Sequence, residues 1–351
     1  MKRHFISVSI LLTAAMLVAA APASATPSAA LAAVSSVEFV NWVTGPNSPN
    51  RTDENWDVHG TDLGVMFEYN DSVLVAFGDT FGCCGNGNGV FGENWRSNAL
   101  AWSSDNDLST GMRLDGMVTD ASGDAVHILN REPGDYTIIP TAGIEVDGQI
   151  YLHYMAVRQW GQPGEWTLNR SGWAYADSPD GVWEQPASAT WQGDSAFGQA
   201  ALVKRDDFLY VFGIPGGRFG GVSLARVPED QILDMSAYRY WDGAGWNPDM
   251  SRAAEVASSP VGELSVAWND HLQSWIMTYL NEQMAAIVIR TAPDLVGPWS
   301  DPMPVVSGTD YPALYGAYLH PWASSGDTIY FTMSQWGQYN VELMRVRLLR
   351  P

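Results

Sequence analysis

Residues 60–82 read GTDLGVMFEYNDSVLVAFGDTFG, and their pattern predicts a β-hairpin. Apolar side chains alternate with other residues at period two on both sides of Asn70-Asp71-Ser72, which supplies the turn. Because a hairpin folds back on itself, Asp62 at its beginning and Asp79 at its end lie at the same end of the sheet. We therefore expect these two aspartates to act as a pair.

The strand pattern of this hairpin recurs along the chain. An apolar strand, an aromatic second strand and a third strand follow one another in each of five copies. The second strands are VLVAFGD from Val73, IYLHYMAV from Ile150, LYVFGIP from Leu209, SWIMTYL from Ser274 and IYFTMSQW from Ile329. The third strands read NALAWSSD, GWAYADSPDG, GVSLARVPED, AIVIRTAPDL and VELMRVRL.

Consecutive repeats that each consist of a few short strands are typical of a β-propeller. We therefore predict an all-β fold, a five-bladed β-propeller. A two-sheet sandwich with insertions is the competing layout, but it does not explain a five-fold recurrence. Helices are expected to be scarce, with one short helix in VPEDQILDMS, which starts at Val227.

The composition agrees with an all-β fold, and the net charge limits the classes of ligand that the protein can bind. The 351 residues include 16 Trp, 14 Tyr, 34 Gly and 20 Pro, as in turn-rich and aromatic-rich β proteins. The formal net charge is −21, so we expect no nucleic acid or anionic lipid partner, because the field of the molecule repels both. A neutral glycan is compatible with that field, although acidity alone also keeps a secreted protein soluble.

The N-terminus has the pattern of a secretory signal peptide. Lys2 and Arg3 precede a mostly apolar run over residues 5–21, and Ala23-Ser24-Ala25 forms a cleavage site. A membrane anchor is the alternative, but the run is short and ends in small residues. We predict a signal peptide over residues 1–25 and a single catalytic propeller over residues 26–351, without membrane insertion, monomeric, and secreted or in the cell wall.

The two cysteines, Cys83 and Cys84, are adjacent. Export favours a disulfide between them, although a bond between neighbours is strained, and two free thiols or an intermolecular bridge are the alternatives. The pair lacks a third Cys and the six His are scattered, which disfavours a metal site. We predict no required cofactor, and a structural cation in the channel is left open.

The propeller topology predicts which residues surround the central channel, because each blade begins with its innermost strand. The aligned strand beginnings are Thr61-Asp62, Thr141-Ala142, Gln199-Ala200, Glu263-Leu264 and Leu314-Tyr315. Asp62, Asp79 and Glu263 are thus the candidate catalytic acids. Each has a structural alternative, namely capping a strand end, binding a channel cation or bonding turn amides.

Several motifs together resemble a known family. VTGPNSPNRT from Val43, then HGTDLG, AFGDTFG, NWRSNALAWSSD and GELSVAWND are similar, in that order, to motifs of the actinobacterial domain of unknown function family 4185. That family is also classed as glycoside hydrolase family 183, the endo-D-arabinanases. The resemblance covers essentially the whole chain from about residue 36.

The resemblance implies a five-bladed propeller that hydrolyses internal α-linkages of D-arabinofuranose polymers. The implied partner is cell-wall D-arabinan, as in mycobacterial arabinogalactan and lipoarabinomannan, and the implied outcome is inversion at the anomeric carbon. The family's catalytic aspartates, in the GTDLG and GDTF motifs, match Asp62 and Asp79.

Inversion needs one carboxylic acid to protonate the leaving oxygen and one carboxylate to activate water, roughly 6.5 to 9.5 Å apart. We assign Asp62 as the general base and Asp79 as the general acid, with the reverse order open. Glu263 is expected to tune a partner's pKa or to replace Asp79 as the acid.

Sugar binding is expected from aromatic rings and planar hydrogen-bonding groups around the channel. The candidates are Trp95, Arg96, Asn98, Gln159, Trp160, Tyr315, His320 and Trp336. Any of the Trp residues could instead pack between blades. Arg96, close to the hairpin, is expected either to orient a carboxylate or to bind substrate hydroxyls.

Two other classes share features of this sequence. A non-catalytic, lectin-like propeller of the cell wall would share the fold and the aromatic residues, but would gain little from two adjacent buried carboxylates. A sialidase-like exo-enzyme is suggested by the turn SPDGVW from Ser178, yet such enzymes need an arginine cluster, and few arginines are expected near these acids.

Overall fold

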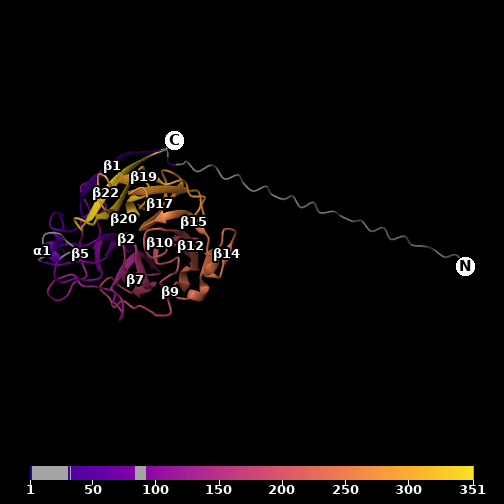
Figure 1. Cartoon of the computed structure of the whole chain (residues 1–351), viewed down its shortest axis with the longest axis horizontal. Helices are drawn as coiled ribbons and strands as arrows, with labels where there is room; N and C mark the ends of the chain where they lie inside the picture. Colours follow the sequence, from indigo (N-terminus) through magenta and orange to yellow (C-terminus); the bar gives the residue numbers. More distant parts are fainter. Residues whose placement is uncertain (2–30, 32, 84–91, 351) are drawn as a thin grey trace.

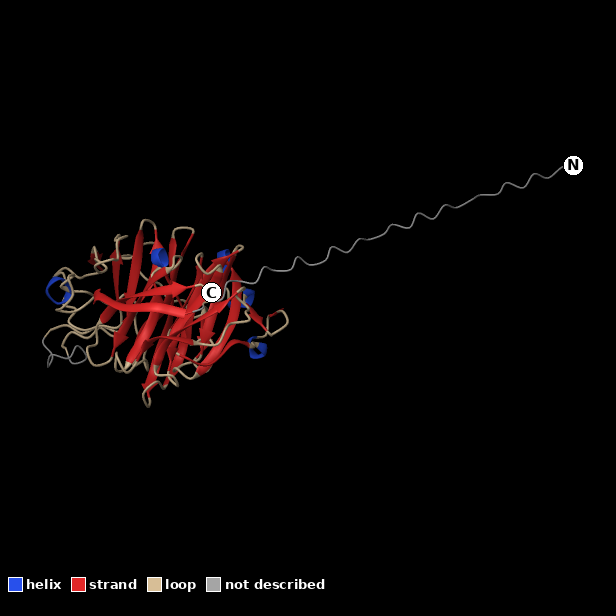
Figure 2. Cartoon of the chain, turned by 90° about the horizontal axis from the view of Figure 1, so that it is seen from above, coloured by secondary structure: helices blue, strands red, loops and turns tan. Residues whose placement is uncertain are grey.

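Five small antiparallel sheets surround a common axis in the computed structural model (Figure 1). The structure describes residues 1, 31, 33–83 and 92–350. Strands make up nearly all of the regular structure among these residues (Figure 2). The predicted all-β, five-bladed β-propeller is confirmed.

Each blade is one sheet, and in blades one to four the innermost strand comes first in the chain. Blade one contains β2 (Leu63–Tyr69), β3 (Ser72–Phe77), β4 (Ala99–Ser103) and β5 (Gly116–Met117). Blade two contains β6 (Thr137–Val146), β7 (Gln149–Trp160), β8 (Trp166–Ala176) and β9 (Thr190–Gln192). Blade four contains β16 (Leu264–Asn269), β17 (Ser274–Asn281), β18 (Ala286–Ala292) and β19 (Met303–Ser307).

Blade three has a divided outer edge. Its strands are β10 (Gln199–Arg205), β11 (Phe208–Ile214), β12 (Gly220–Pro228), β13 (Arg239–Trp241), β14 (Trp246–Asn247) and β15 (Glu255–Val261). Both β13 and β15 pair with β12, at different parts of that strand.

Blade five joins the two ends of the chain. Its strands are β20 (Leu314–Leu319), β21 (Thr328–Gln335), β22 (Val341–Leu349) and β1 (Ala33–Trp42). The N-terminal β1 pairs antiparallel with the C-terminal β22, and Figure 1 shows the two side by side. The backbone hydrogen bonds of this pair close the ring, a feature that the repeat pattern did not predict.

The hairpin at residues 60–82 forms as predicted. The turn between β2 and β3 places Asn70 at φ 51°, a left-handed conformation that Asn tolerates. The pairing of Leu63 with Phe77 brings the segments before β2 and after β3 to the same end of the sheet. All the predicted second strands (β3, β7, β11, β17 and β21) and third strands (β4, β8, β12, β18 and β22) are present.

The short helix predicted from Val227 is wrong. Two 3-10 turns, Glu229–Gln231 and Met235–Ala237, replace it. The Asp234 side chain accepts a hydrogen bond from the Ser236 backbone N–H, so this aspartate starts a new turn instead of continuing a helix.

The other helices within the part of the chain that the structure describes are short. They are α1 (Thr52–Trp56) and the 3-10 turns Met250–Arg252 and Pro321–Ala323. Within the described ranges, no helix has the length and apolar character needed to cross a membrane.

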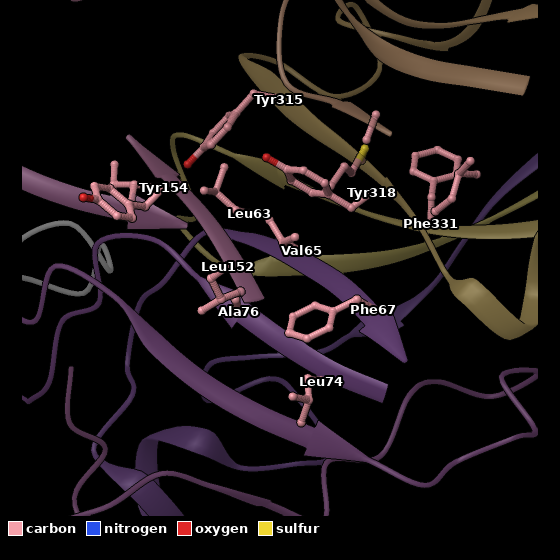
Figure 3. Close-up of a cluster of buried hydrophobic side chains, with 14 of the residues drawn as sticks. Leu63, Val65, Phe67, Leu74, Ala76, Leu152, Tyr154, Tyr315, Tyr318 and Phe331 are labelled. Atoms are coloured by element: carbon pink, nitrogen blue, oxygen red, sulfur yellow. The ribbon is translucent and has the colours of Figure 1, made fainter. Parts of the chain in front are cut away.

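Side chains of the inner strands pack around the centre of the molecule, where β2, β6, β10, β16 and β20 together line a cavity of about 320 Å³. Figure 3 shows Leu63, Val65 and Phe67 of β2 beside Tyr315 and Tyr318 of β20, and all five belong to one buried cluster. Blades one and five therefore meet through β2 and β20. This contact fixes the residues at the beginning of both strands, where the candidate site lies.

Candidate active site

The inner strands bring their first residues to one end of the propeller. Asp62 directly precedes β2, Glu263 directly precedes β16, and Tyr315 is the second residue of β20. Asp79 reaches the same end from the exit of β3. The hairpin geometry thus brings Asp62 and Asp79 together, as the sequence predicted.

Asp62 is a buried carboxyl group. Its Oδ2 atom accepts a hydrogen bond from the Tyr315 hydroxyl at 2.9 Å. The pKa of Asp62 is raised to about 8, mainly by burial and next by the charge of Asp79, while the hydrogen bond from Tyr315 acts in the opposite direction. This carboxyl group is therefore held protonated at neutral pH.

Asp79 has more polar surroundings. Its Oδ1 atom accepts hydrogen bonds from the Thr137 hydroxyl at 2.6 Å and from the Trp95 indole N–H at 3.1 Å. The pKa of Asp79 is raised to about 6, because burial outweighs the lowering by these two bonds and by the charge of Arg131. The Arg131 guanidinium lies 4.7 Å from the centroid of the Trp95 ring. Asp79 thus ionises before Asp62 as the pH rises.

Glu263, the third predicted acid, is bound in a buried ion pair. Arg218 donates to it from Nη2 at 2.7 Å and from Nε at 3.0 and 3.1 Å, and also contacts Glu282 at 3.2 Å. The Arg218 guanidinium lies 5.0 Å from the centroid of the Tyr315 ring. Glu263 therefore holds the arginine that packs on Tyr315, the hydrogen-bond partner of Asp62.

Seven of the eight predicted sugar-binding residues lie at this end of the propeller; Arg96 and Asn98 bind neighbouring loops there, and five remain as candidates for sugar contact. Trp95 and Tyr315 contact the acids directly. The other three are Gln159 and Trp160, at the end of β7 beyond the pairing of Val157 with Thr137, and Trp336, directly after β21. Trp336 is 58% exposed and packs edge-to-face on the buried Tyr339.

Arg96 orients a carboxylate, one of the two roles expected for it, but that carboxylate belongs to Asp57, and the sugar contact expected of Asn98 is corrected. The buried Arg96 donates to the side chain of Asp57 at 3.3 Å and to its backbone carbonyl at 2.8 Å. The buried Asn98 donates to the carbonyls of Leu129 and Ile138 and accepts from backbone N–H groups. Both side chains satisfy buried polar groups of neighbouring loops instead of pointing towards the acids.

His320 also lies away from the site. It follows the C-terminal end of β20, whereas Tyr315 lies near the other end of that strand. The His320 imidazole is buried, and burial lowers its pKa to about 4. The expected sugar contact of His320 is therefore corrected.

The beginning of blade two differs from the predicted one. β6 begins at Thr137, and the predicted first residue, Thr141, lies inside the strand with its hydroxyl 2.6 Å from Nδ1 of His153. Pro140, directly before the predicted beginning, sits at an irregularity of the register, where a strand tolerates proline. Thr137, missed in the sequence, takes the place beside Asp79.

Arginines near the acids are more numerous than the sequence suggested. Arg131 and Arg218 both lie at the site, and a glycine-rich segment, PGGRFGG from Pro215, was the available signal for Arg218. Arg218 pairs with Glu263 and Glu282, so its charge is balanced within the protein. These contacts do not form the free arginine cluster of a sialidase.

The disulfide between Cys83 and Cys84 and the signal peptide stay predictions. Cys84 and most of the predicted signal peptide lie outside the described residues. Among residues 33–83 and 92–350, no three or more His, Cys, Asp or Glu side chains are grouped so as to hold a metal ion.

The fold and the site together define a β-propeller with a pair of carboxyl groups, one buried and one half-buried, at one end of its inner strands. The chain belongs to the family described as "Domain of unknown function (DUF4185)", whose model matches residues 47–345. A curated relative, Notoamide biosynthesis cluster protein J of Aspergillus sp. (strain MF297-2), is 28% identical over 316 residues, and the match covers 80% of each chain.

Solved structures share the propeller. One from Bacteroides ovatus has a TM-score of 0.61 at 13% identity and covers 83% of this chain and 86% of its own. A family 117 glycoside hydrolase of Zobellia galactanivorans has a TM-score of 0.52 at 13% identity, with 89% and 90% covered. At such low identities, these likenesses show the fold alone.

Proposed function

We propose that this protein is an inverting glycoside hydrolase that cleaves internal α-D-arabinofuranosyl linkages of cell-wall arabinan, as the family 183 motifs imply. The observation that carries the proposal is the pair Asp62 and Asp79, two neighbouring carboxyl groups in unlike surroundings. Such a pair can provide an acid and a base at the same pH. A solved structure with this fold is named a glycoside hydrolase, which supports the class.

The surroundings of the two carboxyl groups favour the reverse of the order assigned from the sequence. Asp62, with its pKa near 8, carries the proton and acts as the general acid on the leaving oxygen. Asp79, with its pKa near 6 and two hydrogen-bond donors on Oδ1, is ionised and activates the water. Between about pH 6 and pH 8, Asp62 is protonated and can act as the acid, while Asp79 is ionised and can act as the base.

The rate of hydrolysis should therefore follow a bell-shaped pH profile. It should rise as Asp79 ionises through about pH 6 and fall as Asp62 loses its proton through about pH 8. Initial rates of oligosaccharide release, measured across both limits, check this expectation. A rate that keeps rising above pH 8 would contradict Asp62 as the acid.

Gly78 is expected to be essential to the position of Asp62. A Cβ atom at Gly78 would lie 2.3 Å from Oδ1 of Asp62, so Gly78→Ala must displace this carboxyl group. We expect about a 100-fold loss of kcat, because misplacement of a catalytic group by about 1 Å has effects of this size. Gly245→Ala is the matched control, since its added Cβ meets no atom within 4 Å. Equal kinetics for the two variants would contradict this role.

Digestion of arabinogalactan by the purified protein tests the proposed function. Discrete arabino-oligosaccharides, separated by chromatography, are the expected products of an endo-acting enzyme. Release of single sugars alone would overturn the endo mode. Binding of the polymer without any release would favour the lectin-like alternative.

We also propose, from the apolar run after Lys2 and Arg3, that the protein is exported and meets its substrate outside the cell. Detection of the processed chain in culture medium or in the wall fraction, with its N-terminus sequenced, tests this step. An unprocessed chain retained inside the cell would contradict it.

A further inference from the structure

We propose that Tyr136, Trp160, Trp166 and Phe219 form an aromatic shelf that binds several consecutive sugar residues of a neutral glycan beside the acid pair. This inference rests on the proposed function and assigns part of its substrate site. It adds Tyr136, Trp166 and Phe219 to the residues predicted from the sequence.

Three rings of the shelf, Tyr136, Trp160 and the half-buried Trp166, follow one another in contact, and Phe219 lies beside the turn next to them. Tyr136 and Trp160 lie edge-to-face with centroids 6.5 Å apart, and Trp160 and Trp166 do so at 5.6 Å. Tyr136 is 58% exposed, Trp160 39% and Phe219 51%. Single exposed aromatic residues are common on protein surfaces, whereas a contiguous group marks an interaction site.

Blades two and three both contribute to the shelf. The turn between β7 and β8 contains Gly164, and a Cβ atom there would lie 3.0 Å from the Phe219 ring. The carbonyl of Gly164 also accepts a hydrogen bond from the Arg218 backbone N–H at 2.9 Å. These contacts fix Phe219 next to the turn that leads into Trp166.

Both ends of the shelf connect to the acids. Tyr136 is followed by Thr137, whose hydroxyl bonds Asp79. At the other end, the Arg218 guanidinium lies 5.6 Å from the centroid of the Trp166 ring and 5.0 Å from that of Tyr315, the partner of Asp62. A chain that lies on the shelf is therefore led towards the carboxyl pair.

The chemistry of the shelf suits a neutral sugar chain. In an edge-to-face pair each ring keeps at least one face that its partner does not cover. The C–H face of a sugar ring can pack on such an aromatic face, which removes apolar surface of both from water. The nearby Arg218 is engaged by Glu263 and Glu282, so it offers no free charge to an acidic polymer. The net charge of −21 also repels anionic ligands.

Affinity for arabinogalactan should depend on the shelf. The test uses the full chain carrying Asp62→Asn, so that the polymer is not cut during the measurement, and compares it with the same chain carrying Tyr136→Ala and Trp160→Ala. We expect the shelf substitutions to weaken binding in affinity electrophoresis about tenfold or more. Trp268→Ala is the matched control. This tryptophan is 36% exposed and pairs edge-to-face with Trp275, but lies at the far end of β16 from Glu263.

The outcomes separate the shelf from the catalytic proposal. Unchanged binding in the shelf variant, with hydrolysis by the wild type, overturns the shelf and leaves the glycosidase intact. Binding that depends on the shelf, without hydrolysis by the wild type, supports the shelf and overturns the glycosidase. If the shelf substitutions abolish self-association in light scattering and leave glycan binding unchanged, the rings form an interface between copies and the proposal is wrong.

Discussion

Asp62→Asn and Asp79→Asn should each reduce arabinan hydrolysis by about 10²- to 10⁴-fold, the range that general acid–base groups contribute. Asp62→Asn removes the proton donor, and Asp79→Asn removes the carboxylate that activates water. Oligosaccharide release at fixed polymer concentration measures both losses. Asp71→Asn is the control, because this exposed aspartate lies in the turn at the opposite end of the same hairpin. Full activity in either site variant would contradict its role.

The thermal stability of Asp62→Asn shows whether a loss of activity comes from the missing proton donor or from a disturbed fold. The pKa of Asp62 is raised from 3.8 to about 8 on folding, so the stability from its protonated form is complete below pH 4 and is lost as the pH rises towards 8. Asparagine stays neutral, so Asp62→Asn should flatten this decline and unfold at a higher temperature than the wild type at pH 8. A variant that is both inactive and less stable at pH 8 would indicate a structural role for Asp62.

Arg218→Met should destabilise the protein by about 3–5 kcal/mol, because it leaves the carboxylate of Glu263 buried without its partner. Glu263 is only 5% exposed and accepts three hydrogen bonds from Arg218. Denaturant unfolding of the wild type and the variant measures the loss. The variant should also lose activity, because Arg218 packs on the tyrosine that bonds Asp62.

A second substitution and a surface control sharpen this test. Glu263→Gln in the Arg218→Met background removes the buried charge and should recover most of the stability. Arg205→Met should change stability by no more than about 1 kcal/mol, because Arg205 pairs with Asp206 and Asp294 at the surface. A similar small change for Arg218→Met would contradict the importance of the buried pair.

The local pattern of alternating apolar residues and turns in the sequence predicted the blades and the pairing of Asp62 with Asp79. Alternation and a turn at Asn70 are sufficient to define a hairpin, and the hairpin alone brings Asp62 and Asp79 to one end. The displacement of His320 could also have been foreseen, since five residues of strand carry it roughly 17 Å from Tyr315. The sugar-binding residues were chosen by type and not by their position along a strand.

Contacts between residues that are far apart in the chain could not be predicted from such local patterns. The pairing of β1 with β22 joins the two ends of the chain, and the partners Arg218 and Glu263 belong to different blades. Alignment of the repeats placed the beginning of β6 at Thr141, whereas the strand runs on from Thr137 through Pro140, at a register irregularity where a strand tolerates proline. Tertiary packing, and not local preference, decides these features.

Early proton NMR of arabinan digested by the wild-type protein is the most direct test of the central claim that Asp62 and Asp79 form an inverting acid–base pair. We expect new reducing ends whose anomeric configuration is opposite to that of the cleaved linkage, before mutarotation mixes the two forms. Reducing ends that first appear with the original configuration, or no new reducing ends at all, would contradict the claim.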